Sequence, residues 1–506
     1  MTAGTDRWET ILAGIRQKQS FARQMGGAER VERHRAAGKL DARQRAESLF
    51  DDGSFVEIGA LTGIQSETGA APAPADGLIA GFGLVDGRPV LAGIEDFTVL
   101  GGSIGDAGAA KRYRLTQLAA QERVPLIFML EGAGHRLTNS HGVPTPNDLQ
   151  GLAELSGLTP IVCLVLGASA GHGALAAPLS DFVAMTEAAS MFVAGPPLVK
   201  GAIGESVTKE ELGGSDIHLA ASGVAHNLAK DDVAAIAMAR RYLSYLPRNA
   251  WETPERRVNP DTGPRRLDAI LELIHPDPRI PFDMTALLEM LADEGTLFEV
   301  QPLYGRAMVT ALAQLGGWSV AIVANNPSVG AGAIDSAAAR KAAHFMDVAD
   351  AFHLPVLFLA DTPGVMPGTV AERSGILRHA ARMFVTQHRL SVPKIHVTLR
   401  KAFGFGSSVM AMNPFDGQTL RLAFPAISLG AMPAGSGAQA AKLDEATRDK
   451  VAAEQAASAM QLADRMVYDD VIDPRELRNA VLNGLKLAEH RLTGPCAPRQ
   501  VKGITP

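Results

Sequence analysis

The chain has 506 residues, of which 46% are apolar and 20% are charged, and its formal net charge is -6. A single core stops growing at roughly 250 to 300 residues, so a chain of this length is expected to form at least two cores. The composition excludes a largely disordered chain, and the negative charge gives no electrostatic reason to expect nucleic-acid binding. No apolar run approaches the roughly 20 residues that span a bilayer, so no membrane association is expected.

The two cysteines and the N-terminal residues indicate an intracellular protein. Cys163 and Cys496 lie far apart and offer neither a disulfide framework nor a metal-ligand spacing. Residues 1–10 are polar and lack the apolar core of a signal peptide. His218 and His226 also lack the spacing of metal ligands. A cytoplasmic protein without a metal site is therefore expected.

The predicted elements alternate in the manner of an α/β fold. In chain order, the expected elements are helices over 8–38 and 40–49, strands over 78–85 and 90–94, a helix over 104–122 and a strand over 125–130. Asp86-Gly87 between the first two strands suits a tight hairpin turn. The strand over 125–130 is a continuous apolar run, typical of a strand buried on both faces. Helix and strand alternate again through 152–167, which predicts helices packed over sheets.

The second half of the chain repeats the first. Residues 77–134 align with 307–364 at a constant shift of 230 residues, and residues 171–173 align with 404–406 at a shift of 233. A period beyond 200 residues predicts two homologous domains rather than a solenoid of short repeats. Residues 247–264 contain four prolines and no apolar period, which predicts a linker. An N-terminal domain over 1–246 and a C-terminal domain over 265–506 are expected.

Loops of small residues follow buried strands at two places in each half. They are Glu131-Gly132-Ala133-Gly134 and 167–173 in the first half, and Asp361-Thr362-Pro363-Gly364 and 404–408 in the second. Glycine lets a backbone approach a ligand closely, and oriented amides near a helix start hold an enolate oxygen better than water does. A single loop of this kind more often only caps and turns the chain. Four in register favour a site for an enolate.

Ordered motifs from residue 38 to residue 475 carry a family resemblance. They are Gly38-Lys39-Leu40, 53–57, 96–99, 101–103, 191–196, 210–214, 222–226, 298–303, 322–325, 363–364, 367–368, 400–404 and 469–475. In these segments the chain resembles the carboxyltransferase subunit of biotin-dependent acyl-CoA carboxylases. This group includes the propionyl-CoA and methylcrotonyl-CoA carboxylase β subunits.

The resemblance implies two ClpP/crotonase-like ββα domains in one chain and a homo-hexamer built as a trimer of dimers. The N-terminal domain of one chain would bind acyl-CoA, and the C-terminal domain of a partner chain would bind carboxybiotin. Biotin would be carried by a separate subunit and loaded by a separate biotin carboxylase. The expected reaction, part of fatty acid or branched-chain metabolism, releases CO2 from carboxybiotin, removes the acyl α-proton with the freed ureido nitrogen and joins the enolate to CO2.

The resemblance also implies the site residues. Amides around Gly171, His172 and Gly173 would hold the thioester oxygen, and amides of Phe405 and Gly406 would hold the biotin carbonyl. Further residues are implied on the acyl side (Gly101, Gly102, Gly132, Ala133, Gly134, His135 and Arg136) and on the biotin side (Gly364, Gly404, Ser407 and Ser408). Candidate cations for CoA phosphates or for anchoring the loops are Arg136, Lys200 and Lys401.

The chain departs from the family pattern at the reacting centre. The family's Asp-Ser-Gly-Gly-Ala-Arg is replaced by residues 131–136, and its Gly-Gly by Gly171-His172. Phe405 stands where biotin would need room. His135 or His172 could serve as an acid or base, because imidazole titrates near neutrality. Alternatively, His172 donates only its amide and its ring fits a differently shaped acyl group.

Three functions stay open from the sequence. The first is a carboxyltransferase subunit whose changed loops select an unusual acyl-CoA. It needs separate partners, because the chain has neither a Gly-rich ATP loop nor a Met-Lys-Met biotin attachment sequence. The second is a biotin-independent crotonase-type enzyme, such as an acyl-CoA decarboxylase, hydrolase or hydratase, that uses His172 or His135. The third is a structural hexamer partner of an active paralogue.

Overall fold

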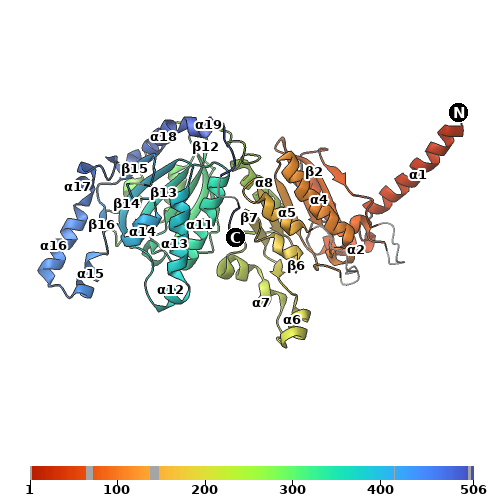
Figure 1. Ribbon diagram of the computed structural model, residues 1–506, viewed down its shortest axis with the longest axis horizontal. Helices are drawn as coiled ribbons and strands as arrows, with labels where there is room; N and C mark the ends of the chain where they lie inside the picture. The colour runs from red at the N-terminus through yellow and green to blue at the C-terminus, as the bar shows by residue number, and fades with distance from the viewer. Residues whose placement is uncertain (1–2, 64–71, 137–146, 415, 500–502) are drawn as a thin grey trace. The chain divides into compact units, whose positions relative to one another are not determined.

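A computed structural model describes residues 3–63, 72–136, 147–414, 416–499 and 503–506. The chain forms two compact units, one from Met1 to Ser244 and one from Tyr245 to Thr505 (Figure 1). Each unit is built on one large mixed sheet with helices packed against it. The predicted α/β class is therefore confirmed.

The sheet of the first unit has the order β1-β2-β3-β4-β5-β7-β9. Its strands are β1 (Val56–Ile58), β2 (Leu78–Val85), β3 (Arg88–Glu95), β4 (Leu126–Leu130), β5 (Ile161–Val165), β7 (Phe182–Thr186) and β9 (Asn227–Ala229). The first three strands are antiparallel, and the strands from β3 onward are parallel. Asp86 and Gly87 have positive φ and form the predicted hairpin turn. Every residue of β4 and β5 is buried, as expected for central parallel strands.

The second unit repeats this order as β10-β11-β12-β13-β14-β15-β17. Its strands are β10 (Phe298–Val300), β11 (Met308–Leu315), β12 (Trp318–Asn325), β13 (Val356–Thr362), β14 (Lys394–Phe403), β15 (Leu420–Ala423) and β17 (Asp470–Val471). Helices α11 (Ser336–Ala351) and α13 (Ile376–Arg389) pack together against the sheet (Figure 1). They correspond to α4 (Asp106–Glu122) and α5 (Asp148–Leu155) of the first unit.

The remaining elements flank these sheets. In the first unit they are α1 (Ala3–Arg23), α2 (Ala28–Ala36), α3 (Ala42–Leu49), β6 (Ala168–Ala170), β8 (Ser190–Phe192), α6 (Pro196–Ile203), α7 (Lys209–Gly213) and α8 (Asp232–Tyr245). In the second they are α9 (Ile270–Leu273), α10 (Met284–Leu291), α12 (Thr369–Arg373), α14 (Gly404–Val409), β16 (Ser428–Gly430), α15 (Ala434–Ala441), α16 (Glu445–Ala456), α17 (Ser458–Asp464), α18 (Leu477–Leu487) and α19 (Glu489–Thr493). No helix of the described ranges is long and apolar enough to cross a membrane.

A buried lysine marks the same position in both repeats. Lys111 Nζ donates to the carbonyls of Ala75 and Leu78, and Lys341 Nζ donates to those of Gln301, Tyr304 and Met308. Each lysine thereby joins the helix that follows the long hairpin of its unit, α4 or α11, to the start of that hairpin. The repeat seen in the sequence thus extends to individual contacts.

Two predicted helices differ from those observed. The helix expected over 8–38 is divided between α1 and α2, because Gly26 packs against Thr98 and Gly27 has a φ of +90°. In Figure 1, α1 extends away from the body of the first unit. The helix expected from residue 104 begins at Asp106, because Gly105 is extended and the Ile104 carbonyl accepts from the Arg136 N–H instead of a helical N–H.

Residues 247–264, expected to be a linker, belong to the second unit. The Arg257 N–H donates to the Gly317 carbonyl at 2.8 Å, and Arg256 Nε donates to the Gly316 carbonyl at 2.9 Å. The Arg256 guanidinium also lies over the Trp318 ring, 5.1 Å from its centroid. The proline-rich segment therefore packs against the turn between β11 and β12.

We expect the second unit to lose stability in mild acid because of His396. Its imidazole is buried, with Nδ1 bonded to the Met410 carbonyl and Nε2 to the Thr398 hydroxyl. Burial lowers the pKa of His396 from 6.5 to about 4. The unfolded chain therefore binds more protons between these two values, so the free energy of unfolding should fall by about 3 kcal/mol as the pH drops from 6.5 to 4.

Tryptophan fluorescence can follow this unit separately. Trp251 and Trp318 belong to the second unit, whereas Trp8 is 64% exposed on α1 and should respond little to unfolding. Urea unfolding at several pH values should show the loss in the wild type, and H396Q should flatten this part of the pH dependence. If the free energy of unfolding of H396Q fell as steeply with pH, other titrating groups would be responsible for the loss of stability.

Candidate functional site

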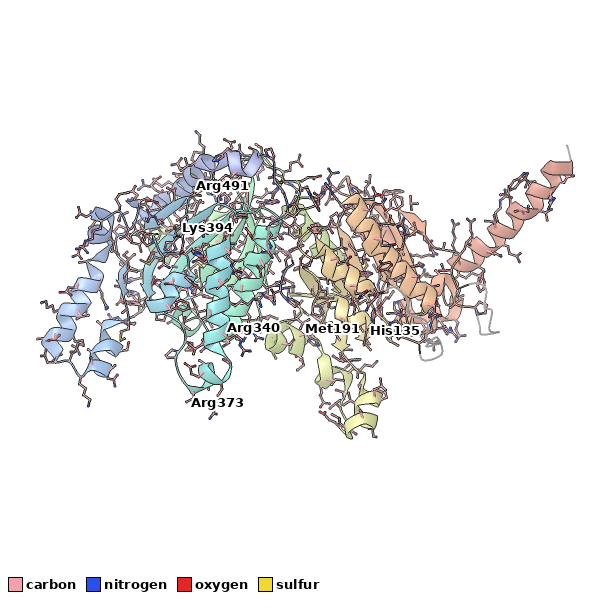
Figure 2. The ribbon with its side chains drawn as sticks, in the orientation of Figure 1. His135, Met191, Arg340, Arg373, Lys394 and Arg491 are labelled. Atoms are coloured by element: carbon pink, nitrogen blue, oxygen red, sulfur yellow. The ribbon has the colours of Figure 1, made fainter. Side chains whose placement is uncertain are left out.

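The first cradle, residues 132–135 with 171–173, forms where the loop after β4 meets the turn after β6. The Ala170 N–H donates to the Gly132 carbonyl at 3.0 Å. A Cβ placed on Gly134 would lie 2.9 Å from the Ala170 carbonyl oxygen and 3.8 Å from Gly171 Cα. Glycine at 134 thus allows the two loops to touch. Figure 2 labels His135 in the first loop and Met191 in β8, and both lie at the same edge of the unit.

Two amides of the first cradle are occupied, whereas those at its helical turn are unused. The Gly171 N–H donates to the Phe192 carbonyl and the Ala133 N–H to the Gly101 carbonyl, both at 3.0 Å. The N–H groups of His172 and Gly173 lie at the start of the helical turn Gly173–Ala176 and have no acceptor among the described residues. An oxygen placed at this turn would therefore meet the amides of His172 and Gly173 rather than that of Gly171.

Gly101 and Gly102 contact the loop after β4, next to the first cradle. Their φ angles are +66° and +62°, which favour glycine. A Cβ on Gly102 would lie only 2.3 Å from the Glu131 carbonyl oxygen. Both glycines therefore set the path of the loop after β4.

A buried network of charges joins the two loops of the first cradle. Glu95 accepts from the Glu131 N–H at 2.7 Å and from Arg112 Nη1 at 3.0 Å. Arg112 Nε donates to Asp148 Oδ2 at 2.6 Å, and His172 Nε2 lies 2.5 Å from Asp148 Oδ1. Glu95, Arg112 and Asp148 are each at most 2% exposed. One loop is held through its backbone and the other through the His172 ring.

The network sets the ionisation of its members. Burial opposes ionisation of Asp148, but Arg112 and His172 together hold the pKa of that carboxyl well below its usual range. Burial raises the pKa of Glu95, against the attraction of Arg112. Asp148 is therefore a carboxylate near neutral pH and can only accept hydrogen bonds.

His135 meets His172 between the two loops. Their ring centroids are 4.6 Å apart, and the rings lie edge to face at 62°. Burial, and next the nearby His172, lowers the pKa of His135. His135 is therefore neutral at neutral pH.

The candidate cations differ in their surroundings. Arg136 pairs with Asp76, and its Nη2 donates to the Ser103 carbonyl at 2.8 Å. Lys401 lies 3.2 Å from Asp361 and is 7% exposed. These two side chains anchor loops. Lys200, on α6, is exposed.

The second cradle, residues 362–366 with 404–406, repeats the backbone of the first. The Ile334 N–H donates to the Gly364 carbonyl at 3.0 Å, as Ile104 does to Gly134 at 2.8 Å. A Cβ on Gly406 would lie 2.7 Å from Gly364 Cα, so this contact requires glycine. Gly404, with a φ of +52°, begins α14, and the Phe405 and Gly406 amides belong to its first turn and have no helical acceptor.

The side chains of α14 in and beside the second cradle contact nearby residues of the same unit. The Phe405 ring lies 5.5 Å from that of Phe384 on α13 and is 45% exposed. Ser407 Oγ donates to the Gly404 carbonyl, and Ser408 Oγ donates to Asn413 Oδ1. The two serines therefore stabilise the turn itself.

The charge network has no equivalent in the second unit. Asn325 replaces Glu95 and still accepts from the Asp361 N–H at 3.1 Å, but Ala342 and Phe405 stand where the first unit has Arg112 and His172. Sequence reasoning missed Glu95, Arg112 and Asp148, which match no motif. The only signal in the sequence was that Glu95 and Arg112 differ from Asn325 and Ala342, their counterparts in the second repeat.

A cavity of about 490 Å³ adjoins the first cradle. Its lining includes Arg30, Arg33 and Lys39 together with Gly101 and Glu131. Lys39 pairs with Glu131 at 2.5 Å, whereas Arg30 and Arg33 are exposed on α2. Among the described residues, no group of three or more His, Cys, Asp or Glu side chains could hold a metal ion.

Residues 33–501 match the carboxyl transferase domain family. The chain belongs to the carboxyl transferase family. It is 36% identical to the methylmalonyl-CoA decarboxylase subunit alpha of Veillonella parvula, with 94% of each chain covered. It is also 36% identical to the methylmalonyl-CoA carboxyltransferase 12S subunit of Propionibacterium freudenreichii subsp. shermanii (93% of each chain) and to the propionyl-CoA carboxylase carboxyltransferase subunit of Haloferax mediterranei (96% of this chain and 97% of that protein).

Solved structures agree with this membership. This carboxyl transferase superposes on transcarboxylase 12S, solved as a hexamer with methylmalonyl-coenzyme A bound, with a TM-score of 0.90, 33% identity and coverage of 98% of this chain and 99% of that chain. A single-chain, multi-domain long-chain acyl-CoA carboxylase gives a TM-score of 0.82 at 29% identity, over 94% of this chain and 50% of that chain. The resemblance seen in the sequence is confirmed, and these relatives favour an acyl-CoA carboxyltransferase over a biotin-independent crotonase-type enzyme.

Proposed function

We propose that this carboxyl transferase is the carboxyltransferase subunit of a biotin-dependent acyl-CoA carboxylase and carboxylates the α-carbon of a short acyl-CoA. The observation that carries the proposal is the pair of cradles, each with amides free at the start of a helical turn, in a chain whose residues 33–501 match the family. Relatives named for propionyl-CoA and methylmalonyl-CoA support a short acyl group.

The acyl half of the reaction is assigned to the first cradle. The His172 and Gly173 amides would hold the thioester oxygen, where negative charge develops as the α-proton leaves. One such oriented donor contributes about 3 kcal/mol to the stability of an oxyanion. The close approach of Gly134 to Ala170 and the hydrogen bond from Ala170 to Gly132 would hold the two loops in register around the acyl group.

The carrier half is assigned to the second cradle. The Phe405 and Gly406 amides suit a ureido carbonyl, which is an acceptor, and the Phe405 ring is held against Phe384. The residues therefore fit biotin, which supplies the carboxyl group when its carrier docks. Gly364, Gly404, Ser407 and Ser408 shape and stabilise this turn.

The cavity beside the first cradle is assigned to coenzyme A. Its volume lies within the roughly 300 to 1,000 Å³ usual for ligand sites, and Gly101 and Glu131 connect it to the loop after β4. Arg30 and Arg33 would meet the phosphates, because guanidinium groups bind phosphate with paired hydrogen bonds. We therefore propose α2, rather than Arg136 or Lys401, as the element that binds the phosphates.

The proposed assembly follows transcarboxylase 12S, whose structure is described as a hexamer. We propose a homo-hexamer in which the first cradle of one copy works with the second cradle of another copy. A biotin carboxylase and a biotin carrier subunit would complete the enzyme in the cytoplasm.

An acyl-CoA panel tests the function. The purified chain should form the carboxylated thioester from propionyl-CoA or a close homologue only when a carboxylated biotin carrier is supplied, as measured by mass spectrometry. The R30S/R33S variant should raise the KM for acyl-CoA about 30-fold with little change in kcat, since each of the two lost phosphate contacts removes about 1 kcal/mol of uniform binding. K18S, a change on α1 outside the cavity lining, serves as its control. Turnover without any biotin carrier would refute the proposal.

A further inference from the structure

We propose that His172, oriented by Asp148, is a base that removes and returns the acyl α-proton, so that this chain exchanges that proton without any biotin carrier. The inference rests on the proposed acyl-CoA function and adds a catalytic residue to it. The resemblance by itself implies no protein base, because the freed ureido nitrogen would take the proton.

The hydrogen bond to Asp148 decides which nitrogen of His172 is free. Asp148 is a carboxylate held by Arg112 on its other oxygen, so it accepts a proton from His172 Nε2 across 2.5 Å. A neutral ring in this tautomer carries its lone pair on Nδ1. Nδ1 has no hydrogen-bond partner among the described residues, and the His172 side chain is 19% exposed. This arrangement leaves a basic nitrogen available to a ligand.

In the proposed acyl pose, the thioester binds at the same residue that carries this nitrogen. The amide of His172 itself is one of the two free donors for the thioester oxygen. An oxygen bound there lies about 2.9 Å from the nitrogen, and the α-carbon is two bonds from that oxygen. The side chain of the same residue is therefore within reach of the α-proton, as a general base must be.

Charged and titratable groups face the His172 ring from several elements. From α4 and α5, Arg112 and Asp148 form an ion pair below the ring, with Glu95 of β3 on the far side of Arg112. From the loop after β4, His135 contributes a ring whose lowered pKa keeps it neutral. Asp148 can then stabilise the positive charge that forms on His172 during proton transfer.

The second unit provides an internal comparison. Phe405 occupies the position of His172, and Ala342 that of Arg112. The second cradle therefore keeps the amides and lacks the base. This difference agrees with the proposed roles, because only the acyl half of the reaction removes a carbon-bound proton.

The step is a simple proton transfer. Nδ1 takes the α-proton, the electron pair of the C–H bond enters the enolate, and the amides of His172 and Gly173 hold the enolate oxygen. When no carboxyl group is present, the imidazolium returns a proton to the same carbon. In D2O the ring proton is replaced by deuterium, so the thioester becomes labelled at the α-carbon.

The experiment measures deuterium incorporation into propionyl-CoA and its homologues by the full-length chain in D2O, without biotin or carrier. We expect wild-type exchange well above the enzyme-free rate. H172G and H172Q should lose it by at least about 100-fold, the usual contribution of general base catalysis. Added imidazole should restore exchange in H172G by filling the space of the missing ring, which a structural defect would not allow. H388Q, the same change at the Asp416–His388 pair of the second unit, should exchange normally.

A double-mutant cycle tests Asp148 as a positioning residue. D148N should slow exchange in the wild type but add little to H172G, because the two residues act as one unit. Two outcomes would overturn this inference and leave the proposed function standing. In the first, the wild type transfers the carboxyl group normally but shows no exchange without biotin. In the second, exchange is unchanged in H172G. Absence of both carboxyl transfer and exchange across the whole panel would overturn both.

Discussion

Replacing Arg112 with methionine should lower the stability of the first unit by about 3 to 5 kcal/mol, the usual result of removing one partner from a buried ion pair. Arg112 bonds to both Glu95 and Asp148, and its guanidinium lies 4.5 Å from the centroid of the Phe128 ring. Methionine keeps part of the packing volume but leaves two buried carboxyl groups without their cation. Hydrogen exchange of the β4 and β5 amides under increasing urea would measure the loss within this unit.

The control is the same substitution at an exposed pair. Arg16 and Glu9 lie 3.8 Å apart on α1, with side chains 66% and 64% exposed. R16M should change stability by no more than about 0.5 kcal/mol, since exposed pairs are screened by water. Equal effects of R112M and R16M would show that the network does not stabilise the fold.

Alanine at Gly102 and at Gly332 should disable different halves of the reaction. A Cβ at either position would lie 2.3 Å from a carbonyl oxygen, that of Glu131 in the first unit and that of Asp361 in the second. Both glycines also have positive φ. The loop must shift in each variant, and a shift of about 1 Å near a reacting group can cost 100-fold in rate.

The two variants are distinguished by partial reactions. G102A should weaken acyl-CoA binding in calorimetry and abolish α-proton exchange, while it still discharges a carboxylated carrier. G332A should bind acyl-CoA normally and fail to discharge the carrier. G435A is the control, since a Cβ on Gly435 of α15 meets no atom within 4 Å. Equal loss of both partial reactions in each variant would contradict the assignment of one cradle to each substrate.

Local patterns in the sequence predicted the framework of both units. The apolar run that became β4, the Asp86-Gly87 turn and the register of the repeat all depend on residues that are close in the chain. The start of α4 was wrong by two residues because the Ile104 carbonyl bonds to Arg136, a partner 32 positions away. A helix boundary of this kind depends on tertiary contacts, which local propensity does not contain.

The predicted loops of the site also meet in the structure, but their supporting side chains could not be foreseen. The family resemblance implied that Gly134 and Gly171 both lie on the acyl side, and in the structure they follow β4 and β6. The charges beneath them come from β3, α4 and α5, and because these residues are 17, 36 and 24 positions apart on different elements, no local period relates them. Only the packed fold brings Glu95, Arg112, Asp148 and His172 together.

The charge network has a practical consequence for redesign of acyl preference. A change at His172 removes the partner of a buried carboxylate, so altered selectivity there would be mixed with lower stability. Among the residues that the structure describes, the His135 side chain forms no ion pair, and it contacts the His172 ring. Libraries intended to accept bulkier thioesters should therefore vary position 135 first and leave position 172 unchanged.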